Sequence, residues 1–500
     1  MTTSALTRAA SIPRDAAVRR FIVAELLFLV AFLLYVRSFD AWFIILDFNH
    51  FDAIRSTPAG TFFLRIFDPS DGGQTVVDTG NLYRPVYYTS MWLEYQLFGR
   101  NPLPYYITSA ALHGANTVLV WFLARRVTRS ELAAGFAGLI WALQPTFADA
   151  VAWVSSITDL LLVLFTVSAV LLYANALEAE GRPRWRLYAG SLACAILALG
   201  AKEPGVAVAP LLLGYHVLLG EPDIIRKRQV PWLVLPFFAI IVLYFVLRYA
   251  LVGNLASQDG STQLSFDLFR NVHRLSSIAV VPFLGESQRQ FVLGQTQGIL
   301  GLVLIAITLV AFVFGSRGER FAVWWWFAGL GPFLTLVPLF LVGRYFYLGF
   351  IGLAILAGSG IDKLAQLSAG RAPQVVRVLA GAALATGLIV WLGWLNFDHQ
   401  DSLNGRGEEA QAFVEQLQAA YPSLPADAFL VVAEYPETLA FGGEDDGFMM
   451  RHAVRLVYHQ DIDVMTWRQF LERTSRGEIP PREEQYWFPP QPGTAGAPAP

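Results

Sequence analysis

Long apolar segments alternate with short polar loops along this chain. A helix needs roughly 20 apolar residues to cross the hydrocarbon core of a bilayer, and about eleven segments approach that length. We expect spans at approximately 21–38, 104–123, 132–147, 151–173, 187–201, 205–220, 231–252, 296–315, 321–341, 346–361 and 376–395. The pattern therefore predicts an all-α polytopic membrane protein.

The charges of the loops orient these spans. Every basic stretch falls on one side if each apolar segment crosses the membrane, and the positive-inside rule places that side in the cytoplasm. With an odd number of spans, the N-terminus is then cytoplasmic and the C-terminus is periplasmic, as expected for a protein of a bacterial inner membrane. The basic stretches are 14–20, 125–129, 182–186, 226–228, 317–320 and 371–377.

The composition supports a membrane protein and excludes several other classes. Hydrophobic residues make up 55% of the chain and charged residues only 15%, whereas about a quarter of a soluble domain is charged. The net charge of −3 argues against a nucleic-acid partner. Because Cys194 is the only cysteine, the chain forms no intramolecular disulfide and no cysteine metal site.

The spacing of the spans divides the first four-fifths of the chain into two parts. Residues 1–20 form a cytoplasmic N-terminal segment, and residues 21–395 form the transmembrane domain. Within that domain, two long loops lie on the outer face, at 39–103 and 253–295. We expect chemistry in the first of them, because it is rich in acidic and aromatic residues.

The C-terminal tail has a different pattern. Residues 405–420 have helix-like apolar spacing, and residues 429–433 and 461–466 are typical of short buried strands. These predict a small periplasmic α/β domain over residues 396–479. Residues 480–500 are rich in Pro, Gly and Ala, which is typical of a disordered tail.

The first outer loop carries the candidate catalytic acids, Asp47 and Asp52, with His50 between them. Asp47 follows an apolar run at the membrane edge, where partial desolvation raises the pKa of a carboxyl. A carboxylate of raised basicity suits a general base that takes a proton from a hydroxyl acceptor. The alternative is that each is a loop acid with no catalytic duty.

Four cations map to the outer face, where short turns of membrane proteins are usually poor in them. They are Arg84, Lys202, Arg248 and Arg344, the last followed by Tyr345. A cluster of cations needs an anion, and a lipid-linked phosphate is the natural candidate, since the planar guanidinium fork matches phosphate oxygens. Taken singly, Arg248 and Arg344 could instead extend to the lipid headgroups without further function, and Arg84 could be an interfacial cation packed on tyrosines.

Three acids accompany these cations. Asp149 lies in the first turn of a helix, where the helix dipole alone would explain it. Asp159 lies within an apolar run, at a cost of roughly 2.5–3.5 kcal/mol, so it needs a partner in the bundle interior. Glu203 either forms an interfacial ion pair with Lys202 or frames a site with it.

The order of these motifs resembles the GT-C class of membrane glycosyltransferases, over about residues 20–360. It is most similar to the branch of transmembrane O-mannosyltransferases, although their TPR repeats are missing from this tail. The motifs are Tyr-Arg-Pro-Val at 83–86, Leu-His-Gly-Ala-Asn at 112–116, Gln-Pro-x-Phe-x-Asp-Ala-Val-Ala-Trp at 144–153, Asp-Leu-Leu at 159–161, Ala-Lys-Glu at 201–203 and Arg-Tyr-Phe-Tyr-Leu at 344–348.

The resemblance implies an inverting transfer of a sugar from a polyprenyl-phosphate donor to a glycan, lipid or protein acceptor at the periplasmic face. The base of the family falls on Asp47, with Asp52 as second choice. The donor-phosphate ligands fall on the four cations named above, and Asp149 stands where the family usually has Glu. No cofactor is required. A divalent ion beside Asp47 stays open as an alternative, since carboxylates suit hard cations, but the spacing of the acids does not demand one.

The sequence departs from the family at three further places. Asp47 stands between Leu46 and Phe48, where the family often has two adjacent acids. Gln144 replaces a histidine. An arginine common just before the Asp159 position is absent, and Ser155-Ser156-Ile157-Thr158 stands there.

Two other functions remain open from the sequence alone. A flippase or transporter of a lipid-linked or anionic solute is disfavoured, because no repeat between the two halves is visible and the charges lie near one face rather than at the midplane. A non-catalytic membrane scaffold would not require the acid and the cations to meet. An enzyme requires Asp47, Arg84, Lys202 and Arg344 to lie around one site.

Overall fold

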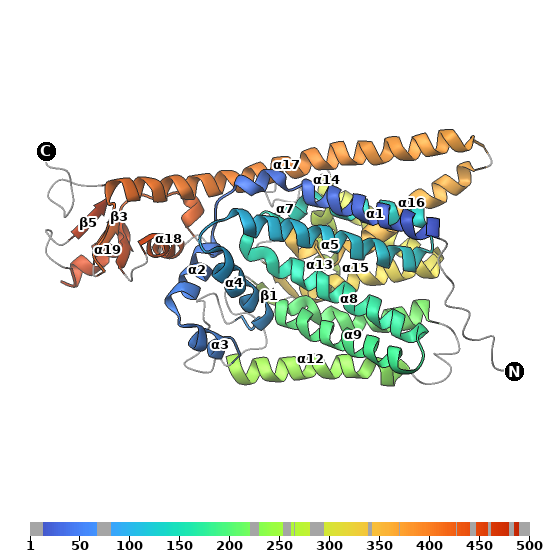
Figure 1. Ribbon diagram of the computed structural model, residues 1–500, viewed down its shortest axis with the longest axis horizontal. Coiled ribbons are helices and arrows are strands. Elements are labelled where there is room, and N and C mark those ends of the chain that lie inside the picture. The colour runs from blue at the N-terminus through green and yellow to red at the C-terminus, as the bar shows by residue number, and fades with distance from the viewer. Residues whose placement is uncertain are drawn as a thin grey trace.

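Most of the chain is helical in this computed structural model. The described residues are 14–67, 82–220, 230–253, 262–264, 266–280, 295–338, 343–369, 371–426, 428–440, 447–458, 462–479 and 485–489. Figure 1 shows a bundle of roughly parallel and antiparallel helices, with a smaller domain beyond one end of it.

Each of the expected spans corresponds to a helix of this bundle. The bundle helices are α1 (Arg14–Leu33), α5 (Leu103–Thr128), α6 (Glu131–Ala142), α8 (Ile157–Glu178), α9 (Gly181–Ala201), α10 (Val208–Gly214) with the π-helical turn η5 (Tyr215–Leu219), α12 (Val230–Val252), α14 (Gln295–Phe314), α15 (Arg317–Thr335), α16 (Phe350–Ser368) and α17 (Gln374–Ala420).

Fewer helices than expected are long and apolar enough to span a membrane by themselves. Among the described residues, five meet both conditions, at 103–128, 154–178, 232–252, 350–368 and 374–420. Three further apolar helices are shorter, at 131–142, 203–219 and 298–314. The prediction of about eleven spans is therefore confirmed only for these five, and the protein is a mostly helical membrane protein.

Local sequence signals set the ends and the packing of the bundle helices. Ser130 caps α6, because its side chain accepts a hydrogen bond from the Ala133 N–H. A Cβ atom at Gly358 would lie 2.2 Å from the Ala133 carbonyl oxygen. Glycine therefore permits the close packing of α16 on α6, as small residues generally do between membrane helices.

The first outer loop folds into short helices at one end of the bundle. After the 3₁₀ turn η1 (Val36–Asp40) come α2 (Leu46–Ser56), α3 (Ala59–Phe67) and α4 (Pro85–Phe98). Figure 1 shows α2, α3 and α4 together between the bundle and the smaller domain. Most side chains of α2 are buried, so this helix packs closely against the end of the bundle.

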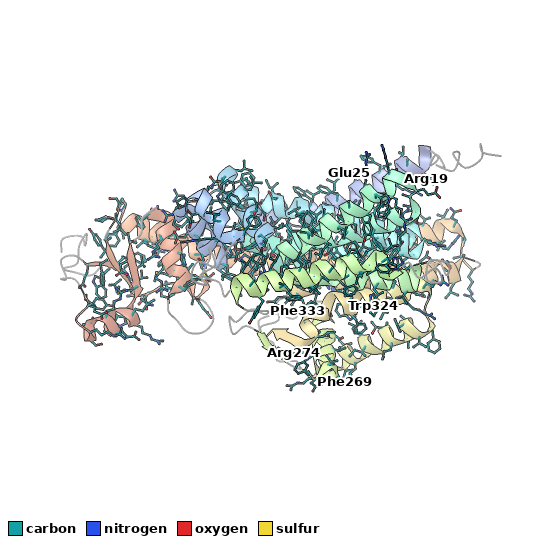
Figure 2. The ribbon with its side chains drawn as sticks, turned by 90° about the horizontal axis from the view of Figure 1, so that it is seen from below. Arg19, Glu25, Phe269, Arg274, Trp324 and Phe333 are labelled. Carbon is teal, nitrogen blue, oxygen red and sulfur yellow. The ribbon has the colours of Figure 1, made fainter. Side chains whose placement is uncertain are left out.

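The second long loop also contains regular structure within its described residues. Helix α13 (Leu268–Val280) packs against α14, and strands β1 (Thr262–Leu264) and β2 (Leu336–Pro338) pair antiparallel. Figure 2 shows Phe269 and Arg274 on α13 at one edge of the molecule. Residues 254–261, 265 and 281–294 of this loop lie outside the described part of the chain.

Helix α17 corrects the expected boundary at residue 395. It has 47 residues, which is about 70 Å at 1.5 Å per residue, and it continues without a break from the bundle into the smaller domain (Figure 1). Gly407 faces the backbone of Trp42, where a Cβ would lie 3.0 Å from the carbonyl oxygen. The expected separate helix at 405–420 is thus the C-terminal end of α17.

The smaller domain contains the predicted α/β structure. Its parallel sheet has the strand order β4-β3-β5, formed by β3 (Phe429–Val432), β4 (Asp463–Thr466) and β5 (Gln485–Phe488). Helices α18 (Phe448–Tyr458) and α19 (Trp467–Ser475) accompany the sheet. Strand β5 shows that the expected disordered tail at 480–500 is wrong for residues 485–488, because they pair with β3 and the side chains of Gln485, Trp487 and Phe488 are buried. Residues 480–484 and 490–500 lie outside the described part of the chain.

Candidate active site

Asp47 lies at the N-terminus of α2 and contacts a distant turn. Its Oδ2 atom accepts a hydrogen bond from the Ile44 N–H at 3.0 Å. Its Oδ1 atom accepts from the Ser155 N–H at 2.8 Å and from the Ser155 hydroxyl. Ser155 belongs to the 3₁₀ turn η3 (Val154–Ser156), which begins the segment leading into α8. The first loop is therefore fixed to the bundle by the candidate base itself.

The surroundings of Asp47 favour a functional acid. The side chain is fully buried, and burial raises the pKa of Asp47 to about 6, against the opposing effect of hydrogen bonds from Ile44 and Ser155. Ile45, two residues before Asp47, has a backbone φ of +47°. This left-handed conformation is strained for a β-branched residue, and such strain concentrates at functional sites.

Arg344 is held beside the same turn. It lies in the 3₁₀ turn η7 (Gly343–Phe346). Its Nη1 atom donates to the Ser156 hydroxyl at 2.6 Å, and its guanidinium carbon lies 4.3 Å from the centre of a Trp153 ring. Because Ser155 and Ser156 are adjacent, one turn holds both the carboxylate of Asp47 and the guanidinium of Arg344.

Lys202 and Asp159 form a buried ion pair next to this turn. The Nζ and Oδ1 atoms lie 2.5 Å apart, and both side chains are almost completely buried. Lys202 also lies 5.3 Å from the centre of the Tyr345 ring. It is close enough to Arg344 to be affected by that charge. Lys202 is therefore the partner that the sequence requires for Asp159.

Glu203 binds the remaining two cations. Both of its carboxylate oxygens accept hydrogen bonds from Arg84, at 2.6–3.1 Å. Arg248 donates to Glu203 Oε1 at 3.2 Å from α12. Glu203 begins the 3₁₀ turn η4 (Glu203–Ala207), directly after Lys202. The four expected phosphate ligands thus lie around one region, three of them already paired with carboxylates.

Arg344 differs from the other three cations. Within the described part of the chain, no ion pair joins it to a carboxylate, and its partners are a hydroxyl and aromatic rings. Its charge is consequently the least neutralised of the four. We regard Arg344 as the cation best placed to bind an anion from outside the protein.

Asp149 connects three elements from its position in α7 (Ala148–Val151). It accepts hydrogen bonds from the Gly343 N–H at 2.9 Å and from His399 Nε2 at 2.9 Å. Burial raises the pKa of Asp149, but His399 and Arg344 outweigh that effect and lower it overall. Asp149 therefore fixes the backbone that carries Arg344 and attaches it to α17.

Asp52 and His50 lie on the same helix as Asp47 but face other partners. Asp52 forms ion pairs with Arg55 at 2.9 Å and with His452 of α18 at 2.8 Å. Burial raises the pKa of Asp52, but these two partners lower it overall. His50 contacts the Leu46 carbonyl oxygen at 2.5 Å and Tyr87 at 3.1 Å. Asp52 is thus directed toward the smaller domain rather than toward the cations.

Sequence reasoning did not identify Ser155, Ser156, Trp153 and His399 as site residues. A signal existed for the serines, since they occupy the stretch where the related enzymes commonly carry an arginine. His399 follows the last apolar run, and nothing in its neighbourhood marks it. Among the described residues, no group of three or more His, Cys, Asp or Glu side chains is placed to hold a metal ion.

Comparison with known proteins matches this architecture to one class of enzyme. Residues 84–249 match the family described as dolichyl-phosphate-mannose-protein mannosyltransferase. The protein O-mannosyl-transferase Tmtc1 of Drosophila melanogaster is 28% identical over 187 residues, which are 37% of this chain and 21% of that protein. The chain therefore aligns with about a fifth of the length of this curated relative.

Solved structures extend the similarity to nearly the whole chain. ArnT from Cupriavidus metallidurans bound to undecaprenyl phosphate has a TM-score of 0.54 at 15% identity, covering 88% of this chain and 85% of that one. The Archaeoglobus fulgidus oligosaccharyltransferase has a TM-score of 0.50 at 13% identity, covering 89% and 64%. The resemblance to GT-C membrane glycosyltransferases is confirmed, and the fold is ArnT-like.

Proposed function

We propose that this protein is a membrane glycosyltransferase that uses a polyprenyl-phosphate sugar as donor. One observation carries the proposal: adjacent serines hold Asp47 and Arg344 at one turn, within an ArnT-like fold. This arrangement provides a base beside a cation that, among the described residues, forms no direct ion pair with a carboxylate. The convergence of Arg84, Lys202 and Arg344 with Asp47 favours an enzyme over a scaffold.

The reaction divides between these two residues. Asp47 takes the proton from an acceptor hydroxyl, whose oxygen then attacks the anomeric carbon of the donor sugar. The bond between that carbon and the phosphate oxygen breaks, and both electrons leave with the polyprenyl phosphate. Arg344 stabilises the negative charge that grows on the departing phosphate. Attack on the side opposite the phosphate inverts the anomeric configuration.

The paired cations have a supporting role in this scheme. Lys202, Arg84 and Arg248 are each held by a buried or half-buried carboxylate. They surround the phosphate position with positive charge while the acids keep the region close to neutral when the donor is absent. Tyr345 packs against Lys202 and Arg344 and limits their movement.

The orientation in the membrane follows from the basic loops. We infer that the site faces the periplasm of a bacterial inner membrane, with the N-terminus in the cytoplasm and the C-terminal domain outside. The acceptor is a glycan, lipid or protein on that side. The contact between Asp52 and His452 keeps the C-terminal domain against the first outer loop, where it would orient the acceptor.

The test compares single variants in a strain that lacks the chromosomal gene. We expect Asp47→Asn and Arg344→Ala each to reduce transfer at least about 100-fold, the size seen when one group that stabilises a transition state is removed. Mass analysis of lipid-linked sugars and surface glycans measures donor accumulation and product loss. Asp40→Asn and Arg65→Ala, exposed side chains of the same loop, are matched controls. Wild-type rates in both test variants would refute the assignment.

A further inference from the structure

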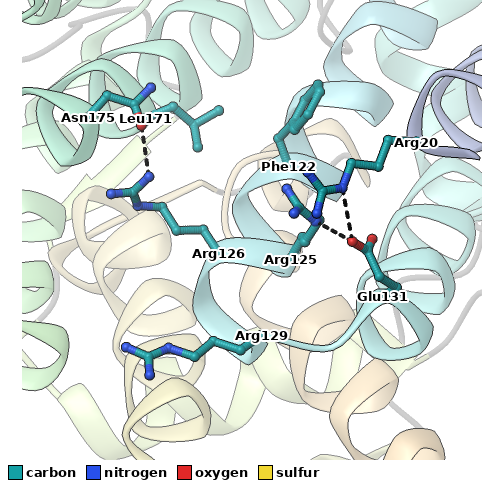
Figure 3. Close-up of a pocket in the computed structure, with 8 residues that line it drawn as sticks. All are labelled: Arg20, Phe122, Arg125, Arg126, Arg129, Glu131, Leu171 and Asn175. Carbon is teal, nitrogen blue, oxygen red and sulfur yellow. Dashed lines mark hydrogen bonds and ion pairs between the residues drawn. The ribbon is translucent and has the colours of Figure 1, made fainter. Parts of the chain in front are cut away.

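A polar pocket lies among the helices of the bundle, and four of its lining side chains are arginines. Its volume is about 670 Å³. Figure 3 shows that its side chains come from α1, α5, α8 and the start of α6. The lining residues are Arg20, Phe122, Arg125, Arg126, Arg129, Glu131, Leu171 and Asn175.

This pocket is separate from the candidate active site. Near the N-terminal end of α5, Tyr106 donates to the carbonyl oxygen of Trp42, a few residues before Asp47. Arg126 follows 20 residues later on the same helix, which is about 30 Å at 1.5 Å per residue. That distance matches the thickness of a bilayer's hydrocarbon core, roughly 30 Å. The pocket therefore lies at the opposite end of the bundle from Asp47.

The positive charge of the pocket exceeds what the protein neutralises. Four guanidinium groups face one lining carboxylate, Glu131, which both Arg20 and Arg125 share, at 3.3 and 2.6 Å. Arg126 pairs with Glu178, from outside the lining, at 2.6 Å. Four positive charges against these two negative charges leave a net charge of plus two within the pocket.

Arg129 is the most exposed of the four arginines. Among the described residues, no hydrogen bond or ion pair fixes its side chain, and Figure 3 shows it across the pocket from Glu131. It ends α5 in the left-handed conformation, with a φ of +57°. Glycine is the usual residue at such a helix end, because a Cβ atom makes the left-handed conformation unfavourable. The chain thus places a charge at this position against the local backbone preference.

Apolar groups adjoin the cations. Phe122, which is 40% exposed, and Leu171 line the same pocket. A ligand that fits must therefore combine an anionic group with a hydrocarbon part. A phosphate accepts bidentate hydrogen bonds from guanidinium groups, and basic pockets between membrane helices bind anionic lipid headgroups.

We propose that this pocket binds a phosphate group carried by an anionic phospholipid. The headgroup phosphate lies among Arg125, Arg126 and Arg129, and an acyl chain lies along Phe122 and Leu171. The site anchors the end of the bundle remote from Asp47 to the lipid leaflet. It does not depend on the glycosyltransferase activity, because no residue of the pocket belongs to the candidate active site.

The test uses the purified full-length protein in detergent, titrated with phosphatidylglycerol or phosphatidylcholine and observed by native mass spectrometry. The key variant is Arg129→Gly, since it removes the charge and also relieves the backbone strain, so it cannot act by unfolding α5. We expect it to weaken phosphatidylglycerol binding at least 5-fold and to leave the weak phosphatidylcholine binding unchanged. Arg125→Gln added to it should weaken binding further.

The matched control is Arg182→Gln, which removes one exposed charge from the same end of the bundle but outside the pocket. Equal losses in Arg129→Gly and Arg182→Gln would show a general charge effect and overturn the proposal, as would unchanged binding in Arg129→Gly. A second arm adds inorganic phosphate at the same concentration as the lipid. If inorganic phosphate does not displace the lipid, the result supports a phospholipid site. Full displacement of the lipid would overturn the proposal and would assign the pocket to free phosphate.

Discussion

At the scale of single residues, Asp47 combines two demands that normally conflict. A general base must be ionised to work, yet a buried carboxyl prefers to stay neutral. The three hydrogen bonds from Ile44 and Ser155 stabilise the carboxylate and hold its pKa at about 6 rather than higher. The residue is thus mostly ionised at neutral pH while keeping more basicity than a surface aspartate.

This balance predicts the pH dependence of transfer. The carboxylate is the active form, so the rate should rise as pH increases through about 6 and level off above it. Ser155→Ala removes the hydroxyl that favours the ionised form. A hydrogen bond to a charged group is worth roughly 1.5–3 kcal/mol, so the rising limb should move up by about one pH unit or more. Initial rates between pH 4.5 and 9 measure the shift.

The control variant is Ser56→Ala, which removes a hydroxyl from the exposed end of the same helix and should leave the rate–pH profile unchanged. A wild-type rate that does not rise near pH 6 would contradict Asp47 as the base.

The same pKa shift affects the stability of the protein. The folded-state pKa of Asp47 lies above its unfolded value, so the neutral form favours folding. This contribution to the free energy of unfolding is fully present below about pH 4 and is lost as pH rises through about 6.

The sequence supports the choice of residue types at this scale but not their pairing. From the sequence, partial desolvation predicts the raised pKa of Asp47, and the cost of burying a charge predicts a partner for Asp159. The sequence does not show that Glu203 pairs with Arg84 rather than with its neighbour Lys202. The choice between partners depends on the directions of the side chains after the helices pack, and the spacing of residues along the chain does not determine those directions.

At the scale of elements, the turn after α9 connects three helices through charge. Lys202 pairs with Asp159 of α8, and the next residue, Glu203, binds Arg84 before α4 and Arg248 of α12. Reversing or removing one charge therefore disturbs more than one helix. This network explains why apolar bundle helices tolerate so many buried charges at one end.

The Lys202–Asp159 pair separates structural from catalytic roles. Lys202→Met leaves the buried carboxylate of Asp159 without a counter-charge, and we expect a loss of about 3–5 kcal/mol in stability. The double variant Lys202→Met/Asp159→Asn removes both charges and should recover most of that loss. Thermal unfolding in detergent measures both effects, with Arg182→Met, which removes an exposed charge far from this pair, as control. If the double variant unfolds as readily as the single one, the pair does not act as an isolated ion pair.

Helix α17 shows where an element-level prediction fails. Hydropathy ends the expected span near residue 395, because Asp398, His399 and Asp401 follow. The helix nevertheless continues, since polar side chains are compatible with helical backbone outside a bilayer. Its buried Asn396 and Gln400 hydrogen-bond to Tyr35 and to the Leu34 carbonyl oxygen. Hydropathy predicts which residues lie within the lipid, whereas the helix continues as long as its backbone hydrogen bonds do.

At the scale of the whole molecule, the alternation of basic and acidic loops predicts two charged regions on opposite sides of the membrane. It separates two charged regions at opposite ends of one bundle, and the structure contains both: the Asp47–Arg344 region and the arginine pocket. The number of helices able to span alone was overestimated, because several apolar segments form helices too short to meet that criterion. A short helix can be buried among the neighbouring helices of a membrane bundle. Hydropathy alone does not distinguish such a helix from one that crosses the whole bilayer.

The C-terminal domain meets the first outer loop through contacts that can be tested as a unit. His452 of α18 pairs with Asp52 at 2.8 Å, and Arg100 Nη1 donates to the Val457 carbonyl oxygen at 3.2 Å. If the domain orients the acceptor, weakening this contact should raise the KM for acceptor several-fold with little change in kcat. The chemistry at Asp47 would be unaffected, since Asp52 faces away from it.

A double-mutant cycle with Asp52→Asn and His452→Ala measures the coupling, and we expect about 1 kcal/mol of interaction energy, within the usual range for contacting residues. Hydrogen exchange should rise in both α2 and α18 in each single variant, because each helix loses the same restraint. Arg468→Ala, an exposed site on α19, should change neither exchange nor KM. An unchanged KM together with raised exchange would mean that the domain is attached by this pair but does not position the acceptor, so the contact is structural only.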